Sequence, residues 1–77
     1  MVTGYILVRL IPGLETDALN HVRSVPGVTD VTLVFGGWDA IVHAEAKTLP
    51  ALSRLVVNQI RGVHGVQATE TLVAAEL

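Results

Sequence analysis

The chain has 77 residues and a formal net charge of −2, which leaves room for one domain and for no basic surface of the kind that binds nucleic acid directly. It contains no cysteine, so disulfides and thiolate metal sites are excluded. Hydrophobic residues make up 51% of the sequence, more than a lone domain of this size needs, and this composition favours self-association.

Strand, helix and strand are expected in the first half of the chain. Residues 5–11 are largely apolar and end at a Pro-Gly pair, which predicts a buried strand. Residues 28–35 are rich in β-branched side chains and predict a second strand. Between them, apolar residues recur at the spacing of a helix, at Leu14, Ala18, Val22 and Val25.

The second half is expected to repeat this order. The Gly36-Gly37 pair predicts a turn, and residues 38–46 predict a third strand that forms a hairpin with the second. Thr48 is a candidate N-cap for a second helix, and residues 67–75 predict the last strand. The order βαββαβ predicts an α+β fold of the ferredoxin-like class, with a four-stranded antiparallel sheet and two helices on one of its faces.

An internal repeat supports this order. Residues 22–28 (VRSVPGV) align with residues 60–66 (IRGVHGV) at an offset of 38 positions (60 − 22), and four of the seven aligned residues are identical. The alignment extends backwards through apolar pairs such as Leu14 and Leu52. A repeat of about half the chain indicates that one supersecondary unit occurs twice.

The two faces of the predicted sheet differ from strand to strand. In residues 40–46, small apolar side chains alternate with a mixed set, so the small set suits packing beneath helices. In residues 5–11 both alternating sets are apolar, and a strand of this kind usually packs against other elements on both faces. Because the helices cover only one face, we expect the sheet of a second copy to cover the other and to form a homodimer.

The sequence contains no pattern typical of a catalytic, metal or cofactor site. Its histidines, His21, His43 and His64, lack the paired spacing of metal ligands. Glu15 and Asp17 open the first helix, where the helix dipole stabilises negative charge. Motifs for a serine nucleophile, a P-loop and dinucleotide binding are missing. We therefore expect no catalytic residues, no metal, no cofactor and no enzyme activity.

Hydropathy and the N-terminus predict the compartment. The apolar runs are far shorter than the roughly 18–20 residues that a membrane-spanning helix needs. The N-terminus lacks the basic start and apolar segment of a signal peptide. These features predict a cytoplasmic protein without a membrane partner.

A glycine turn and a threonine pair form the candidate ligand site. The glycines let a ligand approach backbone N–H groups, and the carboxylate that follows them can receive an ammonium group. Two threonines spaced two apart in the last strand place both hydroxyls on one face. Together these groups could make a compact polar site for a zwitterion. The six residues are Gly36, Gly37, Trp38, Asp39, Thr69 and Thr71.

Three segments carry a resemblance to a known family. Residues 25–28 (VPGV), 36–39 (GGWD) and 65–71 (GVQATET) stand at positions where similar motifs occur in the C-terminal effector-binding domain, or RAM domain, of the Lrp/AsnC transcription regulators. The resemblance covers essentially the whole chain, and the glycine–x–aromatic–Asp turn is its most specific motif. It implies a βαββαβ fold, dimers formed through the sheets and, commonly, four dimers in an octameric ring.

The same resemblance implies an amino acid effector, bound between dimers near the hairpin turn and the last strand. Carried over to this sequence, the binding residues are the six named above. Asp39 would meet the ligand amino group, and the turn backbone and threonine hydroxyls would meet its carboxylate or side chain. The family's usual tyrosine in the turn is Trp38 here, a larger side chain without a hydroxyl, which bears on ligand size and preference.

The regulators also carry an N-terminal helix-turn-helix domain, whereas this chain begins at the first strand. Residues 1–77 are therefore expected to form a single stand-alone RAM-like domain that senses or scavenges amino acids, or that co-assembles with full-length Lrp/AsnC regulators. Two other interpretations stay open. One is a purely structural assembly module, and the other is a small dimeric ferredoxin-like enzyme with a cavity inside each subunit.

Overall fold

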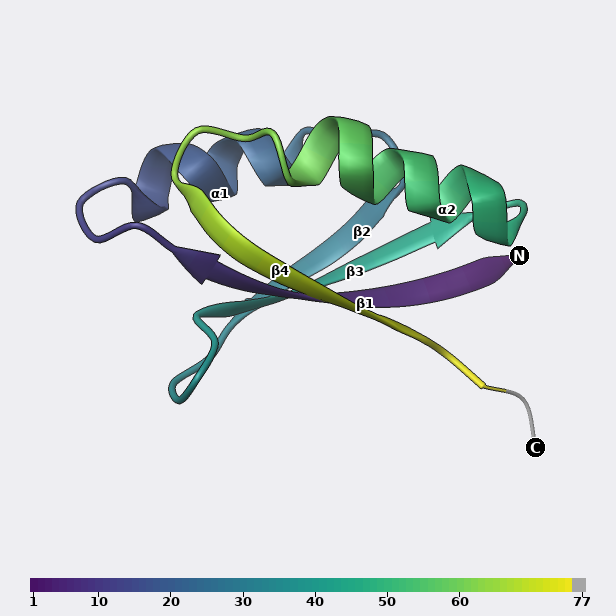
Figure 1. The fold of residues 1–77 in the computed structure, drawn as a ribbon, viewed down its shortest axis with the longest axis horizontal. Coiled ribbons are helices and arrows are strands. Elements are labelled where there is room, and N and C mark those ends of the chain that lie inside the picture. The colour runs from purple at the N-terminus through teal and green to yellow at the C-terminus, as the bar shows by residue number, and fades with distance from the viewer. Residues whose placement is uncertain (76–77) are drawn as a thin grey trace.

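The computed structural model describes residues 1–75 and contains one four-stranded sheet covered by helices on one face (Figure 1). Its elements are β1 (Val2–Leu10), α1 (Glu15–Arg23), β2 (Val28–Leu33), β3 (Ala40–Ala46), α2 (Leu49–Leu55), a π-helical turn η1 (Val56–Ile60) and β4 (Val66–Val73). The strands lie in the order β2-β3-β1-β4, and every neighbouring pair is antiparallel. The predicted ferredoxin-like βαββαβ fold is confirmed.

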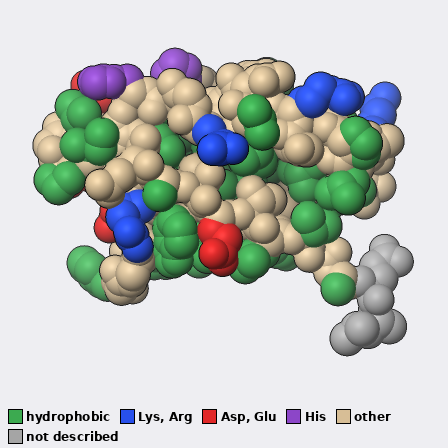
Figure 2. Space-filling model, in the orientation of Figure 1, with side chains coloured by type: hydrophobic (Ala, Val, Ile, Leu, Met, Phe, Trp, Pro, Cys, Tyr) green, Lys and Arg blue, Asp and Glu red, His purple; other side chains and the backbone are tan. Residues whose placement is uncertain are grey.

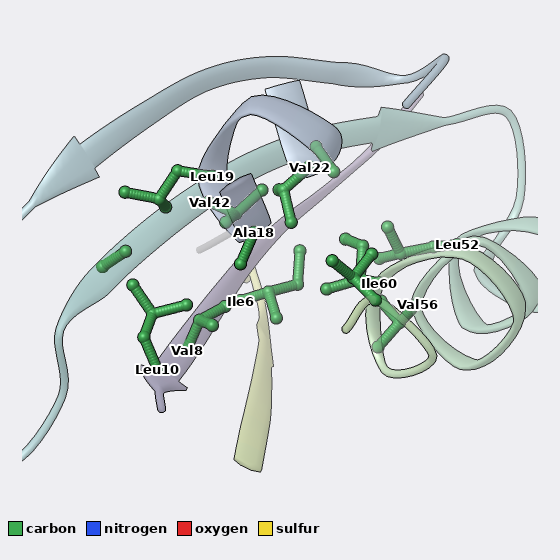
Figure 3. Packing of buried hydrophobic residues seen from close by; sticks show 13 residues of the cluster. Ile6, Val8, Leu10, Ala18, Leu19, Val22, Val42, Leu52, Val56 and Ile60 are labelled. Carbon is green, nitrogen blue, oxygen red and sulfur yellow. The ribbon is translucent and has the colours of Figure 1, made fainter. Parts of the chain in front are cut away.

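The hydrophobic core lies between the sheet and the helices. Figure 3 shows side chains of the central strands pointing toward those of both helices. Ala40, Val42 and Ala44 of β3 are fully buried there, which confirms that the small apolar set lies beneath the helices. The largest fully buried side chains are Ile6, Val8, Val22, Val42, Leu52 and Ile60. Within residues 1–75, no helix is both long and apolar enough to cross a membrane.

The internal repeat is visible at the two helix-to-strand turns. Gly27 precedes β2 with φ 100°, and Gly65 precedes β4 with φ 103°. Such positive φ values favour glycine because it has no Cβ. The carbonyl oxygen of Gly27 accepts a hydrogen bond from the N–H of Glu45, and that of Gly65 accepts one from the N–H of Ile11, both at 2.8 Å. Each half of the chain therefore builds the same turn and ties it to the neighbouring strand.

The connection between β2 and β3 differs from the predicted two-residue turn. It is a six-residue loop, residues 34–39, that is closed by a 3.0 Å hydrogen bond from the N–H of Val34 to the carbonyl oxygen of Asp39. On its other side, the N–H of Asp39 donates to the carbonyl oxygen of Val8 at 2.9 Å, which holds the end of the loop against β1. The loop extends below the sheet, on the side away from the helices (Figure 1).

The second helix changes its pitch halfway. Thr48 caps it as predicted, since its hydroxyl oxygen accepts a hydrogen bond of 3.2 Å from the N–H of Ala51. Buried residues then recur every four positions, at Leu52, Val56 and Ile60. Four residues exceed one α-helical turn of about 3.6 residues, so this face would drift around a regular α-helix. A wider turn corrects the drift, and the N–H of Arg61 donates to the carbonyl oxygen of Val56 at 2.9 Å, five residues back.

Candidate functional site

Two open grooves lie beside the edge strands of the sheet. The α2–β4 groove has a volume of about 550 Å³ and is lined by Leu49, Leu52, Ser53, Val56, Val57, Arg61, Thr69, Thr71 and Val73. The α1–loop groove has a volume of about 390 Å³ and is lined by Leu10, Pro12, Glu15, Thr16, Leu19, Leu33, Val34, Phe35 and Asp39. Both volumes are within the range of roughly 300–1,000 Å³ that is typical of small-molecule sites.

The two grooves are related by the internal repeat. Four pairs of lining residues are separated by its offset of 38 positions: Glu15 and Ser53, Leu19 and Val57, Leu33 and Thr71, and Phe35 and Val73. Their chemistry has diverged, because the α1–loop groove carries two carboxylates whereas the α2–β4 groove carries hydroxyls and one guanidinium group. The same place in the fold is therefore acidic in one half of the molecule and basic in the other.

The structure divides the six predicted ligand residues into two sets. Thr69 and Thr71 lie opposite Val8 and Ile6 in the register of β4 with β1, so they are on the helix side of the sheet and line the α2–β4 groove. The other set is the Gly36–Asp39 part of the loop, of which Asp39 lines the α1–loop groove. Among residues 1–75, neither groove is lined by members of both sets.

Arg9 holds the loop against the end of β1. Its guanidinium group donates two hydrogen bonds to the carbonyl oxygen of Gly37, from Nε at 3.2 Å and from Nη2 at 2.7 Å. The same group lies 5.1 Å from the centre of the Trp38 ring, which is cation–π distance. Sequence reasoning missed this role because Arg9 and the loop are far apart in the chain. The contacts fix the backbone of the glycine turn without a ligand.

Asp39 has a structural partner that the sequence did not reveal. Its side chain is half-buried, and Oδ2 accepts a hydrogen bond of 2.8 Å from the N–H of Leu10. A carboxylate offers about four acceptor positions. One oxygen of Asp39 therefore secures the end of β1, while capacity remains for a ligand ammonium group.

The uncovered face of the sheet is partly apolar. Tyr5 and Leu7 of β1 lie there opposite His43 and Ile41 of β3, and all four side chains are half-buried. The rings of Tyr5 and His43 meet edge to face, with centroids 4.9 Å apart. The prediction that β1 is apolar on both faces is confirmed. In the described part of the chain, residues 1–75, no three His, Asp or Glu side chains are grouped so as to hold a metal ion.

The sequence and the fold match known regulators. Residues 3–76 match the family described as the Lrp/AsnC ligand binding domain. An uncharacterized HTH-type transcriptional regulator from Pyrococcus horikoshii is 33% identical over 75 residues, which are 94% of this chain and 50% of that protein. This chain therefore spans about half the length of the curated relatives it matches.

Solved structures of other proteins share this fold. A protein from Thermus thermophilus is 27% identical with a TM-score of 0.92, and the match covers 100% of this chain and 96% of that one. A transcriptional regulator from Neisseria meningitidis, 22% identical with a TM-score of 0.89, shares the fold over 97% of this chain and 50% of its own. With the family match over nearly all residues, the chain belongs to the Lrp/AsnC ligand binding domain family.

Proposed function

We propose that this domain binds an amino acid and, as an oligomer, regulates transcription in the cytoplasm without catalysing a reaction. The observation that carries the proposal is that Asp39 lines one groove of the subunit, whereas Thr69 and Thr71 line another. Family membership and the similarity to HTH-type regulators support it. The Neisseria regulator was solved as a complex with L-Met, which supports an amino acid as the class of ligand.

In this proposal the ligand lies between two copies of the chain and touches both sets of residues. The Gly36–Asp39 part of one copy would meet Thr69 and Thr71 of another. The loop suits this contact because Arg9 already holds it in place and because its Phe35 side chain is fully exposed. Asp39 then receives the ligand ammonium group, while the turn backbone and the threonine hydroxyls orient the other end of the molecule.

Two kinds of contact between copies would build the assembly. The partly apolar face of Tyr5, Leu7 and Ile41 pairs with its equivalent in a homodimer, as an isologous contact. Contacts between the loop and the α2–β4 groove then join dimers into a higher oligomer such as an octameric ring. Because the curated relatives are about twice as long and are HTH-type regulators, co-assembly with full-length Lrp/AsnC regulators would connect this domain to DNA.

The proposal predicts a selective response to amino acids. Thermal stability and native mass are measured together across the twenty amino acids at a fixed protein concentration. A ligand at a hundred times its dissociation constant adds about 2.7 kcal/mol to the free energy of unfolding, which raises the melting temperature by about 10 °C or more in a domain of this size. We expect one amino acid, or a few related ones, to produce this shift.

Asp39→Asn tests the named residue. The amide oxygen can still accept from the N–H of Leu10, so the fold is expected to remain, while the charge that attracts the ammonium group is lost. The variant should weaken binding by about tenfold or more, the effect of losing one charge-assisted hydrogen bond. Asp17→Asn, an exposed carboxylate on α1, is the matched control and should bind normally. A stable oligomer that responds to no amino acid would instead favour a purely structural module.

A further inference from the structure

Arg61 occupies a distinctive place beside the α2–β4 groove. It also lines an adjoining hollow of about 320 Å³ formed by Arg61, Val66, Gln67, Ala68 and Thr69. Arg61 and Thr69 line both hollows, so Arg61 lies where the two adjoin, beside the threonine pair. Figure 2 shows hydrophobic side chains on either side of the space between α2 and β4 and a basic group at the end of the helix.

The internal repeat supplies a comparison within the same molecule. The counterpart of Arg61 is Arg23, which lines a hollow formed by Arg23, Val28, Thr29, Asp30 and Val31. Each of these five positions is 38 residues before its equivalent beside Arg61. The hollow of Arg23 includes a carboxylate, Asp30, whereas the equivalent residue beside Arg61 is Ala68. The two hollows therefore share an arginine beside an edge strand, whereas Asp30, which pairs with His43, directs its carboxylate to the uncovered face of the sheet.

The helix geometry and the surrounding residues complete the site. Arg61 follows the wide turn of η1, where its own N–H bonds to the carbonyl oxygen of Val56, and π-turns are frequent at functional sites. The groove walls are apolar and uncovered, since Leu49, Val57 and Val73 are each about half exposed. Leu19, the counterpart of Val57 in the first half, is almost fully buried. An uncovered aliphatic wall beside a cation and two hydroxyls suits a molecule with an aliphatic chain and one carboxylate.

We propose that Arg61 binds the carboxylate of a ligand held in the α2–β4 groove, and that the ligand is an amino acid with an aliphatic side chain. This inference rests on the proposed function and makes it more specific. The planar guanidinium group takes the carboxylate by paired hydrogen bonds, Thr69 and Thr71 add hydroxyl contacts, and Val57 and Val73 contact the aliphatic chain. The ammonium group is left for Asp39 of the neighbouring copy.

The test compares Arg61→Gln with Arg23→Gln, its counterpart in the repeat. Both side chains are exposed, so both variants are expected to melt like the unmodified protein without ligand. The probes are L-valine, L-leucine and L-methionine, together with their amides, which keep the ammonium group and the side chain but lack the carboxylate. Dissociation constants are measured by calorimetry for each protein and probe.

The unmodified protein should bind at least one free amino acid of this set about tenfold or more tightly than its amide. Arg61→Gln should weaken binding of the free amino acid by about tenfold or more and leave binding of the amide unchanged. Arg23→Gln should change the binding of neither probe. Equal effects of the two variants, or equal binding of acid and amide, would overturn the role of Arg61. Binding of only non-aliphatic amino acids would overturn the ligand class and leave the proposed function standing. If none of the twenty amino acids binds, the proposed function fails and this inference fails with it.

Discussion

Replacement of Gly65 by alanine is expected to lower the free energy of unfolding by about 3 kcal/mol. Part of this loss is backbone strain, because Gly65 has φ 103° and an L-residue in a sparsely populated region costs about 1–3 kcal/mol. The rest is steric. A Cβ at this position would lie 3.0 Å from the Cβ atoms of Leu14 and Ala18 and 3.1 Å from the carbonyl oxygen of Leu14. Relief of these contacts requires α1 to move away from the turn that leads into β4.

Gly13→Ala separates the two contributions. Gly13 also has a positive φ, 90°, but a Cβ there would meet no atom within 4 Å, so only the strain of about 1 kcal/mol is expected. Chemical denaturation at one protein concentration gives both values. Gly65→Ala should also lower the melting temperature by about 12 °C or more. Equal losses from the two substitutions would show that α1 does not contact Gly65 as described.

Ile60→Ala is expected to lower the free energy of unfolding by about 3–4 kcal/mol. Ile60 is fully buried in η1 and contacts the core formed by the sheet and α1, and truncation of a buried isoleucine leaves a cavity that the structure fills only in part. A domain of 77 residues has a free energy of unfolding of only about 4–12 kcal/mol. The variant should therefore be marginally stable at 37 °C, as measured by urea denaturation.

Val57→Ala, in the same turn, is the matched control. Val57 is about half exposed at the wall of the α2–β4 groove, and its truncation should change the free energy of unfolding by about 0.5 kcal/mol or less. The contrast depends on the wide turn, which directs Ile60 toward the core. Similar losses from both variants would mean that residues 56–60 are wound differently from η1.

Much of the fold could be predicted because the spacing of apolar residues and the positions of the glycine, proline and capping residues indicate the same elements. The strands and the Thr48 cap follow from local chemistry and from the repeat, and the structure confirms them. The six-residue loop and η1 could not be predicted. The loop depends on contacts between distant segments, such as the bond from Asp39 to Val8. The wide turn depends on the burial of Leu52, Val56 and Ile60 against the core, which local propensity does not report.

The candidate site could be predicted only in part, because it too depends on contacts between distant segments. The sequence places Thr69 and Thr71 on one side of β4 but leaves open which side, and the register with β1 decides that they face the helices. The roles of Arg9 at Gly37 and of Asp39 at Leu10 join residues about thirty positions apart. Arg61 had a usable signal in its alignment with Arg23, but only the fold shows that it lines the same groove as Thr69 and Thr71.

The central claim is that the ligand lies between the loop of one copy and the threonine pair of another. Subunit mixing tests it most directly. Asp39→Asn and the double variant Thr69→Val with Thr71→Val should each bind the amino acid that stabilises the unmodified protein about tenfold or more weakly. When the two are unfolded together and refolded as a mixture, random assembly should restore about one quarter of the sites, because each site takes one contribution from each of two copies. Calorimetric recovery of that fraction with the affinity of the unmodified protein is the predicted result, and a mixture in which every site stays weak would contradict a shared site.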